Sequence, residues 1–126
     1  MVTRSAYLMG RDKAAPLTPE LEANLQKLLN ALSLFELLSK RGLPALTSGY
    51  RPASINAAVG GAKKSNHMIC LAADFSDPDG KLDKYCMDNL QVLKDAGLYL
   101  EHPDATPGWC HLQAISPRSG NRVFKP

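Results

Sequence analysis

The segment Ser65-Asn66-His67-Met68-Ile69-Cys70-Leu71-Ala72-Ala73-Asp74-Phe75 decides how this chain must fold. From Leu71 to Phe75 the side chains alternate as in a β-strand, which turns Asp74 away from the apolar face. A carboxylate beside an apolar strand needs a partner because an unpaired buried charge is costly, and His67 is the nearest candidate. A fully extended chain would separate the two residues by about 20 Å, at about 3.3 Å per residue. We therefore expect a bend between His67 and Asp74, and a metal ion would give the chain a reason to bend.

The composition is that of an ordinary globular protein. A chain of 126 residues can bury one hydrophobic core and is too short for two, so we expect a single domain over residues 1–126. The net charge of +3 is mild; it is compatible with an anionic partner such as a cell-wall polymer, but ordinary solubility is the favoured interpretation. Scattered basic residues with few aromatics argue against nucleic acid, and no segment is long enough to span a bilayer. We expect a monomer that binds neither nucleic acid nor membrane.

Residues 1–10 contain one basic residue, Arg4, and no apolar run typical of a signal peptide. This predicts synthesis in a cytoplasm without export by a visible signal. The three cysteines, Cys70, Cys86 and Cys110, are odd in number and lack CxxC spacing. We expect free, mostly buried thiols, with a cysteine zinc site or a cysteine nucleophile as less favoured alternatives.

The pattern of the chain predicts helices and short strands in alternation. A helix of about 24 residues should begin after an N-cap at Thr18, with Pro19 at its first position, and end at Gly42. A second long helix is predicted over 81–96, with the apolar residues Leu82, Tyr85, Cys86, Leu90 and Leu93 buried. The remaining predictions are an irregular arm or edge strand over 1–17, strands over 45–47, 98–100 and 109–113, a short helix over 53–59 ended by Gly60-Gly61, and a polar tail over 116–126.

Arg51 is presented from a constrained loop. Gly49 permits a bend or a close backbone approach, and Pro52 forces Arg51 toward an extended conformation. A guanidinium held in this way suits bidentate capture of a carboxylate. A structural salt bridge is an equally good interpretation of the local sequence.

Three side chains of the metal-ligand type fall on one side of the predicted sheet. Alternation in 109–113 places Trp109, His111 and Gln113 on one face, with Cys110 and Leu112 toward the core. Together with His67 and Asp74, His111 completes a set of two imidazoles and one carboxylate, which is typical of catalytic zinc with an open fourth position. Such a site can hydrolyse an amide. The alternative is a hydrogen-bonded core histidine near a structural aspartate.

Three segments carry a resemblance to a known family. Ser65-x-His67-x-x-Cys70-x-Ala72-x-Asp74 resembles SxHxxGxAxD, a motif of the M15 zinc peptidases, which include D-Ala-D-Ala carboxypeptidases and phage endolysins that act as L-alanyl-D-glutamate peptidases. Ser48-Gly49-Tyr50-Arg51 resembles the SGYR segment of that family, and Trp109-Cys110-His111-Leu112-Gln113 resembles its WxHLQ strand. The segments follow one another in the order of the family, between Leu46 and Gln113.

The resemblance implies an α+β fold of the hedgehog/DD-peptidase type, a small antiparallel sheet with flanking helices. It implies zinc held by His67, Asp74 and His111. Arg51 would orient the substrate or stabilise the developing oxyanion, and Ser65 and Trp109 would line the substrate site. The implied substrate is the stem peptide of bacterial peptidoglycan, cut by an endopeptidase or a carboxypeptidase. Without a signal peptide, a phage lysis or virion enzyme made in the host cytoplasm and acting on the cell wall is expected.

Two positions depart from the family motif. Cys70 stands where the family has glycine, which predicts crowding or a different backbone there. Gly108 stands three residues before His111, where active members usually carry the catalytic carboxylate that acts as general base. Glu101 is the favoured replacement, because the strand before it anchors it. Asp104 is the second candidate, and His102 is a weaker one.

These departures keep two other functions open. One is a catalytically impaired, zinc-binding protein of the same fold that binds cell walls or builds a virion. The other is a cytosolic interaction domain whose histidines and aspartate are purely structural.

Overall fold

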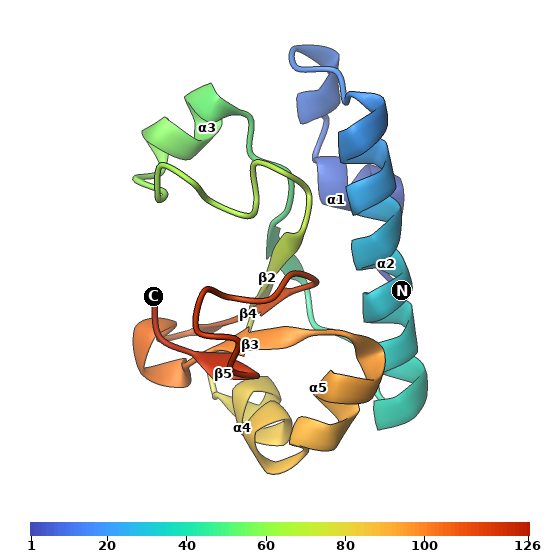
Figure 1. The fold of residues 1–126 in the computed structure, drawn as a ribbon, viewed down its shortest axis with the longest axis vertical. Coiled ribbons are helices and arrows are strands. Elements are labelled where there is room, and N and C mark those ends of the chain that lie inside the picture. The colour runs from blue at the N-terminus through green and yellow to red at the C-terminus, as the bar shows by residue number, and fades with distance from the viewer.

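A five-stranded sheet forms the centre of the fold (Figure 1). The computed structural model describes residues 1–126, with strands β1 (Leu46–Ser48), β2 (Ala72–Ser76), β3 (Tyr99–Glu101), β4 (Trp109–Gln113) and β5 (Val123–Phe124). The spatial order is β1-β2-β4-β3-β5, and every pair is antiparallel except β3 with β5. The α+β class is thus confirmed, but the sheet is mixed rather than antiparallel, because the segment expected to be a polar tail supplies β5.

The longest helix begins where the sequence predicts and ends earlier. Helix α2 (Pro19–Ser39) follows Thr18, whose hydroxyl accepts the N–H of Leu21 at 3.2 Å. It ends before Gly42 because Lys40 itself takes the left-handed C-cap conformation, with φ of 55°. The buried face of α2 packs on the sheet as a hydrophobic stripe: Leu25, Leu28, Ala31, Leu32 and Phe35.

The second long helix is two helices. Helix α4 (Lys81–Asp88) and helix α5 (Leu90–Ala96) meet at Asn89, which has φ of −133° and ψ of 51°. The side-chain amide of Asn89 donates to the carbonyl of Tyr85 at 2.8 Å, a local bond that competes with a continuous helix. Leu90, which was predicted to be buried, therefore begins a new helix at the surface and is 43% exposed.

The N-terminal arm is helical, and it forms hydrogen bonds with the loop that carries Arg51. Helix α1 (Arg4–Leu8) and the 3-10 turn η1 (Arg11–Lys13) replace the expected irregular arm. The hydroxyl of the buried Tyr7 donates to the carbonyl of Ala72 at 2.6 Å, and the Tyr7 carbonyl accepts the N–H of Tyr50 at 3.1 Å. Two further elements are the predicted short helix α3 (Ala53–Ala58) and the 3-10 turn η2 (Pro103–Ala105).

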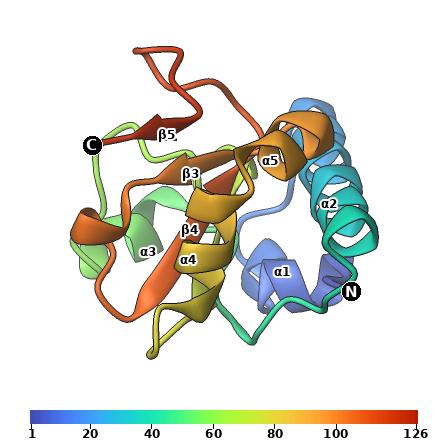
Figure 2. The same ribbon diagram turned by 90° about the horizontal axis from the view of Figure 1, so that it is seen from below.

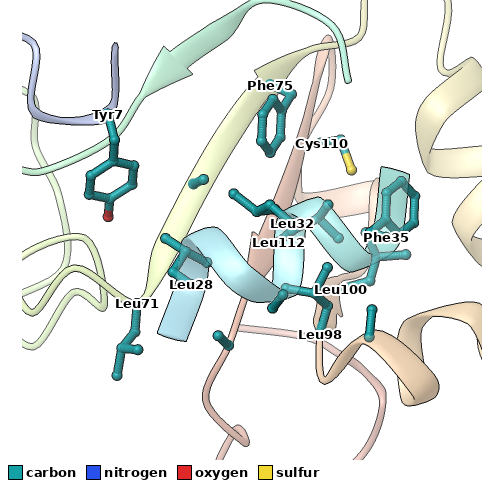
Figure 3. Packing of buried hydrophobic residues seen from close by; sticks show 14 of the residues in the cluster. Tyr7, Leu28, Leu32, Phe35, Leu71, Phe75, Leu98, Leu100, Cys110 and Leu112 are labelled. Atoms are coloured by element: carbon teal, nitrogen blue, oxygen red, sulfur yellow. The ribbon is translucent and has the colours of Figure 1, made fainter. Parts of the chain in front are cut away.

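One face of the sheet is buried and the other is left for the site. Leu71, Phe75, Cys110 and Leu112 belong to the hydrophobic core, together with side chains of α2, as the alternation predicts (Figure 3). Helices α1 and α2 lie on one side of the sheet and α3 lies on the other (Figures 1 and 2). All three cysteines are buried and free, as expected. None of the helices is both long and apolar enough to cross a membrane.

Candidate functional site

Asp74 and His111 are brought together by the register of the sheet. They are directly opposite each other on the antiparallel strands β2 and β4, and neither belongs to the hydrophobic core on the other face. Opposed residues of neighbouring strands have Cβ atoms about 4.5–5.5 Å apart, close enough for their side chains to meet. Here Nδ1 of His111 lies 2.8 Å from Oδ1 of Asp74.

His67 reaches the same face through the predicted bend. The N–H of Leu71 donates to the carbonyl of Asn66 at 3.0 Å, and Cys70 takes a left-handed conformation with φ of 62°. Glycine adopts this conformation without steric cost, so Cys70 keeps a backbone that suits the glycine of the family motif rather than a different one. The bend carries Nε2 of His67 to 3.2 Å from Oδ2 of Asp74.

The three side chains form a group that could hold a metal ion. One ligand atom from each lies within 4.8 Å of the others, and all three residues are buried. Nε2 of His67 is enclosed by protein and has no hydrogen-bond partner, because its contact with Asp74 is poorly aligned. A buried polar atom without a partner requires an explanation, and a cation among two imidazoles and a carboxylate supplies one. The donor set therefore fits a metal.

Charge is concentrated on Asp74. Burial alone would raise the pKa of Asp74, but the hydrogen bond from His111, the close contact with His67 and the charges of both imidazoles together outweigh burial and hold it well below its usual value. Burial lowers the pKa of His111, but the hydrogen bond with Asp74 and its charge, the contact with Gln113 and the Glu101 charge together raise it more, so the net shift is upward. Asp74 is thus ionised at neutral pH, and a bound metal would replace the protons that the imidazoles share with it.

Arg51 is fixed beside this group by three side chains. Its Nε donates to Oγ of Ser48 at 2.9 Å, and its Nη1 donates to Oδ1 of Asn56 at 3.2 Å. Its Nη2 lies 3.3 Å from Oδ2 of Asp74. The structural salt bridge therefore exists, yet two of the five guanidinium N–H bonds are left for another ligand.

Asn56 and Gly61 support Arg51, and sequence reasoning missed both. The Asn56 amide donates to the carbonyl of Ala62 at 2.8 Å while its oxygen accepts from Arg51. A Cβ at Gly61 would lie 2.0 Å from Oδ1 of Asn56 and 2.8 Å from Nη1 of Arg51, so only glycine fits. The Gly60-Gly61 pair was the available signal, but we interpreted it only as a helix end.

The group opens into a cavity of about 170 Å³. Its lining includes every predicted metal ligand and every predicted substrate-binding residue. The complete lining is Arg51, Ala62, Ser65, His67, Asp74, Glu101, Trp109 and His111. A larger hollow of about 580 Å³ lies between α2 and α5, but its lining offers no carboxylate and no imidazole. The smaller cavity is the candidate site because it is the one whose lining combines imidazoles with carboxylates.

Glu101 reaches the cavity from the strand on the other side of β4. Leu100 of β3 pairs with Leu112, so the next residue of β3 falls beside His111. Burial raises the pKa of Glu101; attraction to His111 opposes this shift and repulsion from Asp74 adds to it. The Glu101 carboxylate makes no hydrogen bond with the protein, which leaves it free to exchange a proton.

Asp104 and His102, the other candidates for a general base, lie outside the cavity lining. The turn η2 directs Asp104 to solvent, with its side chain 80% exposed and 3.6 Å from Nδ1 of His102. The N–H of Asp104 also donates to that imidazole nitrogen at 3.1 Å, so the two residues cap their own turn. Gly108 has φ of 88°, and its carbonyl accepts the N–H of Asp77 at 2.9 Å. The geometry leaves Glu101 as the candidate base that lies beside the group of possible metal ligands.

Comparison with known proteins gives a family. A sequence model described as Peptidase M15 matches residues 2–103, which include Arg51, His67, Asp74 and Glu101 and end before His111. No curated protein and no solved structure matches the chain. The match covers well over half of the sequence and agrees with the group of possible metal ligands in the cavity. The chain therefore belongs to the Peptidase M15 family.

Proposed function

We propose that this chain is a zinc-dependent peptidase that hydrolyses an amide bond in the stem peptides of bacterial peptidoglycan. The observation that carries the proposal is the meeting of a possible metal-ligand group, a free carboxylate and an anchored guanidinium in one cavity of an M15 family member. The peptidoglycan substrate rests on the three motif-like segments. A role as a phage lysis or virion enzyme is part of the same proposal.

His67, Asp74 and His111 would hold the zinc ion through Nε2, a carboxylate oxygen and Nδ1. When bound, zinc supplies Lewis-acid polarisation of the scissile carbonyl and acidifies water at its open position. The enclosed Nε2 of His67 supports this assignment, because a lone pair with no other partner is available there.

Glu101 would serve as the general base and then as the general acid. It would take the proton from the attacking water and deliver it to the leaving amine. A pKa raised by burial supports this role, since a carboxylate closer to neutrality accepts a proton more readily and still releases it.

Arg51 would bind the substrate with its two remaining N–H bonds. Ser48 and Asn56 already fix the plane of its guanidinium, so little side-chain entropy is lost when a carbonyl or carboxylate oxygen binds. Trp109 and Ser65, on the cavity wall, would contact the peptide on either side.

The test measures metal content and hydrolysis separately. Protein purified with supplementary zinc is analysed for bound metal and then incubated with purified sacculi, and the amines released are identified by mass spectrometry. Less than about half an equivalent of zinc would overturn the metal site. Glu101→Gln should keep zinc and lose amine release, whereas the matched variant Asp104→Asn, outside the cavity, should keep both.

The second candidate function is a zinc-binding protein of the same family that binds cell walls or builds a virion without catalysis. Gly108 favours it, because the usual catalytic carboxylate is replaced there by a residue without a side chain. Zinc-loaded protein that sediments with sacculi and releases no amine would support this candidate against the peptidase.

A further inference from the structure

Gln113 lies behind His111 and was assigned no role by the sequence. It is two residues beyond His111 on β4 and hence on the same face, and it is buried. Its Oε1 is 2.9 Å from Nε2 of His111, the ring nitrogen that faces away from Asp74. Its Nε2 donates to the carbonyl of Ile115 at 2.9 Å.

The orientation of the Gln113 amide follows from its neighbours. A backbone carbonyl only accepts hydrogen bonds, so the NH₂ group of Gln113 must face Ile115. The contact with Asn66 agrees with this orientation, because its Nδ2 donates to Oε1 of Gln113 at 3.3 Å. A flipped amide would place two oxygens together at Ile115 and two NH₂ groups together at Asn66. The oxygen of Gln113 therefore faces His111.

From this network we infer that Gln113 is a positioning residue that fixes the tautomer of His111, so that Nδ1 carries the lone pair offered to a metal. Oε1 of Gln113 can only accept, so Nε2 of His111 must carry a hydrogen. The inference rests on the metal site of the proposed function and adds to it the residue that decides which nitrogen binds.

The two histidines of the site are oriented in opposite senses. Nδ1 of His67 lies 2.9 Å from the carbonyl of Gly49, so His67 carries its hydrogen on Nδ1 and offers Nε2. With a metal bound in place of the proton that Nδ1 shares with Asp74, His111 would carry its hydrogen on Nε2 and offer Nδ1. In each ring an acceptor on the far side selects the nitrogen that faces the group, which is the usual role of the groups behind metal-bound histidines. The acceptor for His67 is backbone, whereas the acceptor for His111 is a side chain that substitution can remove.

The experiment compares zinc-loaded wild type with Gln113→Met, which keeps the length of the side chain and removes its acceptor. We expect the zinc dissociation constant, measured by competition with a chelating dye, to rise about 10–100-fold. In zinc-loaded wild type with ¹⁵N-labelled histidine, NMR should show the hydrogen of His111 on Nε2. In the variant this N–H signal should disappear, because the hydrogen is no longer held by an acceptor and exchanges with water. The His67 signal, with hydrogen on Nδ1, should stay.

Two further variants separate positioning from general stability. Gln91→Met makes the same substitution at an exposed position and should change neither zinc affinity nor the His111 signal. Gln113→Glu keeps an acceptor oxygen and should retain the hydrogen on Nε2 of His111. If Gln113→Met lowers the stability of the metal-free fold but leaves zinc affinity and the His111 signal unchanged, the role is merely structural and the inference is wrong.

The outcomes also distinguish this inference from the proposed function. Wild type that fails to bind zinc overturns both, and the titration reveals this before any variant is compared. Wild type that binds zinc through Nδ1 of His111 but releases nothing from sacculi supports the positioning role and contradicts the peptidase. Hydrogen found on Nδ1 of His111 in the loaded protein overturns the positioning role alone.

Discussion

Replacement of Asp83 by asparagine is expected to stabilise the fold near neutral pH and to leave it almost unchanged in mild acid. Asp83 lies in the first turn of α4, is 5% exposed, and its Oδ1 has no hydrogen-bond partner. Burial raises its pKa from 3.8 to about 6; contacts with Cys110 and Thr106 lower it, and the Asp77 charge raises it. The Asp83 carboxyl group is thus harder to ionise in the folded protein than in the unfolded chain.

The sign and the size follow from proton linkage. The folded state binds the Asp83 proton more tightly than the unfolded chain, so the penalty is absent below about pH 4 and is complete above about pH 6. A shift from 3.8 to about 6 corresponds to about 3 kcal/mol at 1.36 kcal/mol per pKa unit. Asparagine avoids this penalty but loses the favourable charge at a helix N-terminus, about 0.3–1 kcal/mol. The net gain expected at neutral pH is about 2 kcal/mol.

Urea unfolding of metal-free wild type and Asp83→Asn at several pH values between about 4 and 7.5 measures this gain. The quantity to follow is the difference between the two proteins. Asp74, whose pKa is lowered, stabilises the fold above its unfolded pKa and loses this effect on acidification, but it does so in both proteins and cancels. The exposed Asp79→Asn, in the same turn region, should show no such trend. A difference that is flat, or that shrinks as the pH rises, would refute the reasoning.

Three further predictions concern the backbone and the site wall. Gly49→Ala would put a Cβ 2.1 Å from the carbonyl oxygen of Tyr7 and should lower the free energy of unfolding in urea by about 1–3 kcal/mol. Gly42→Ala, with no atom nearer than 3.9 Å, should be neutral, and equal effects of the two changes would contradict the close approach at Gly49. Cys70→Gly should be at least as stable as Cys70→Ala although it buries fewer atoms, because only glycine adopts φ of 62° without strain. A clearly higher melting temperature for Cys70→Ala would show that packing outweighs backbone strain at this position. Phe124→Ala removes a ring packed edge-on against His111 at 6.2 Å and should weaken zinc binding severalfold in a competition titration; unchanged affinity would mean that this wall is passive.

The faces of the strands could be predicted from sequence, but their register could not. Alternation alone places Asp74 and His111 away from the core, because the side-chain period of two holds for any strand. Their position directly opposite each other depends on how β2 and β4 pair, which a single sequence does not encode locally. The motif-like segments supplied that information indirectly, because they resemble a family in which the two residues meet.

The elements that sequence reasoning missed depend on contacts distant in sequence or on weak local signals. Strand β5 has two residues and is defined by backbone bonds, such as the N–H of His102 to the carbonyl of Phe124 at 2.7 Å. No side-chain periodicity predicts such a strand. Helix α1 did carry a signal, since Thr3 caps it by accepting the N–H of Ala6 at 3.1 Å, but five helical residues are too few to show a stripe.

The place of His111 between two strands bears on the departure at Gly108. β4 lies between β2 and β3, so the His111 ring has Asp74 of β2 on one side and Glu101 of β3 on the other. A carboxylate on β3 does not depend on the loop before His111. In that loop Gly108 adopts a left-handed conformation, and its carbonyl accepts the N–H of Asp77. The sheet therefore presents Glu101 beside the group of possible metal ligands without any side chain at position 108. Whether Glu101 acts as that base stays a prediction, and Glu101→Gln, with zinc content measured in the same sample, decides it.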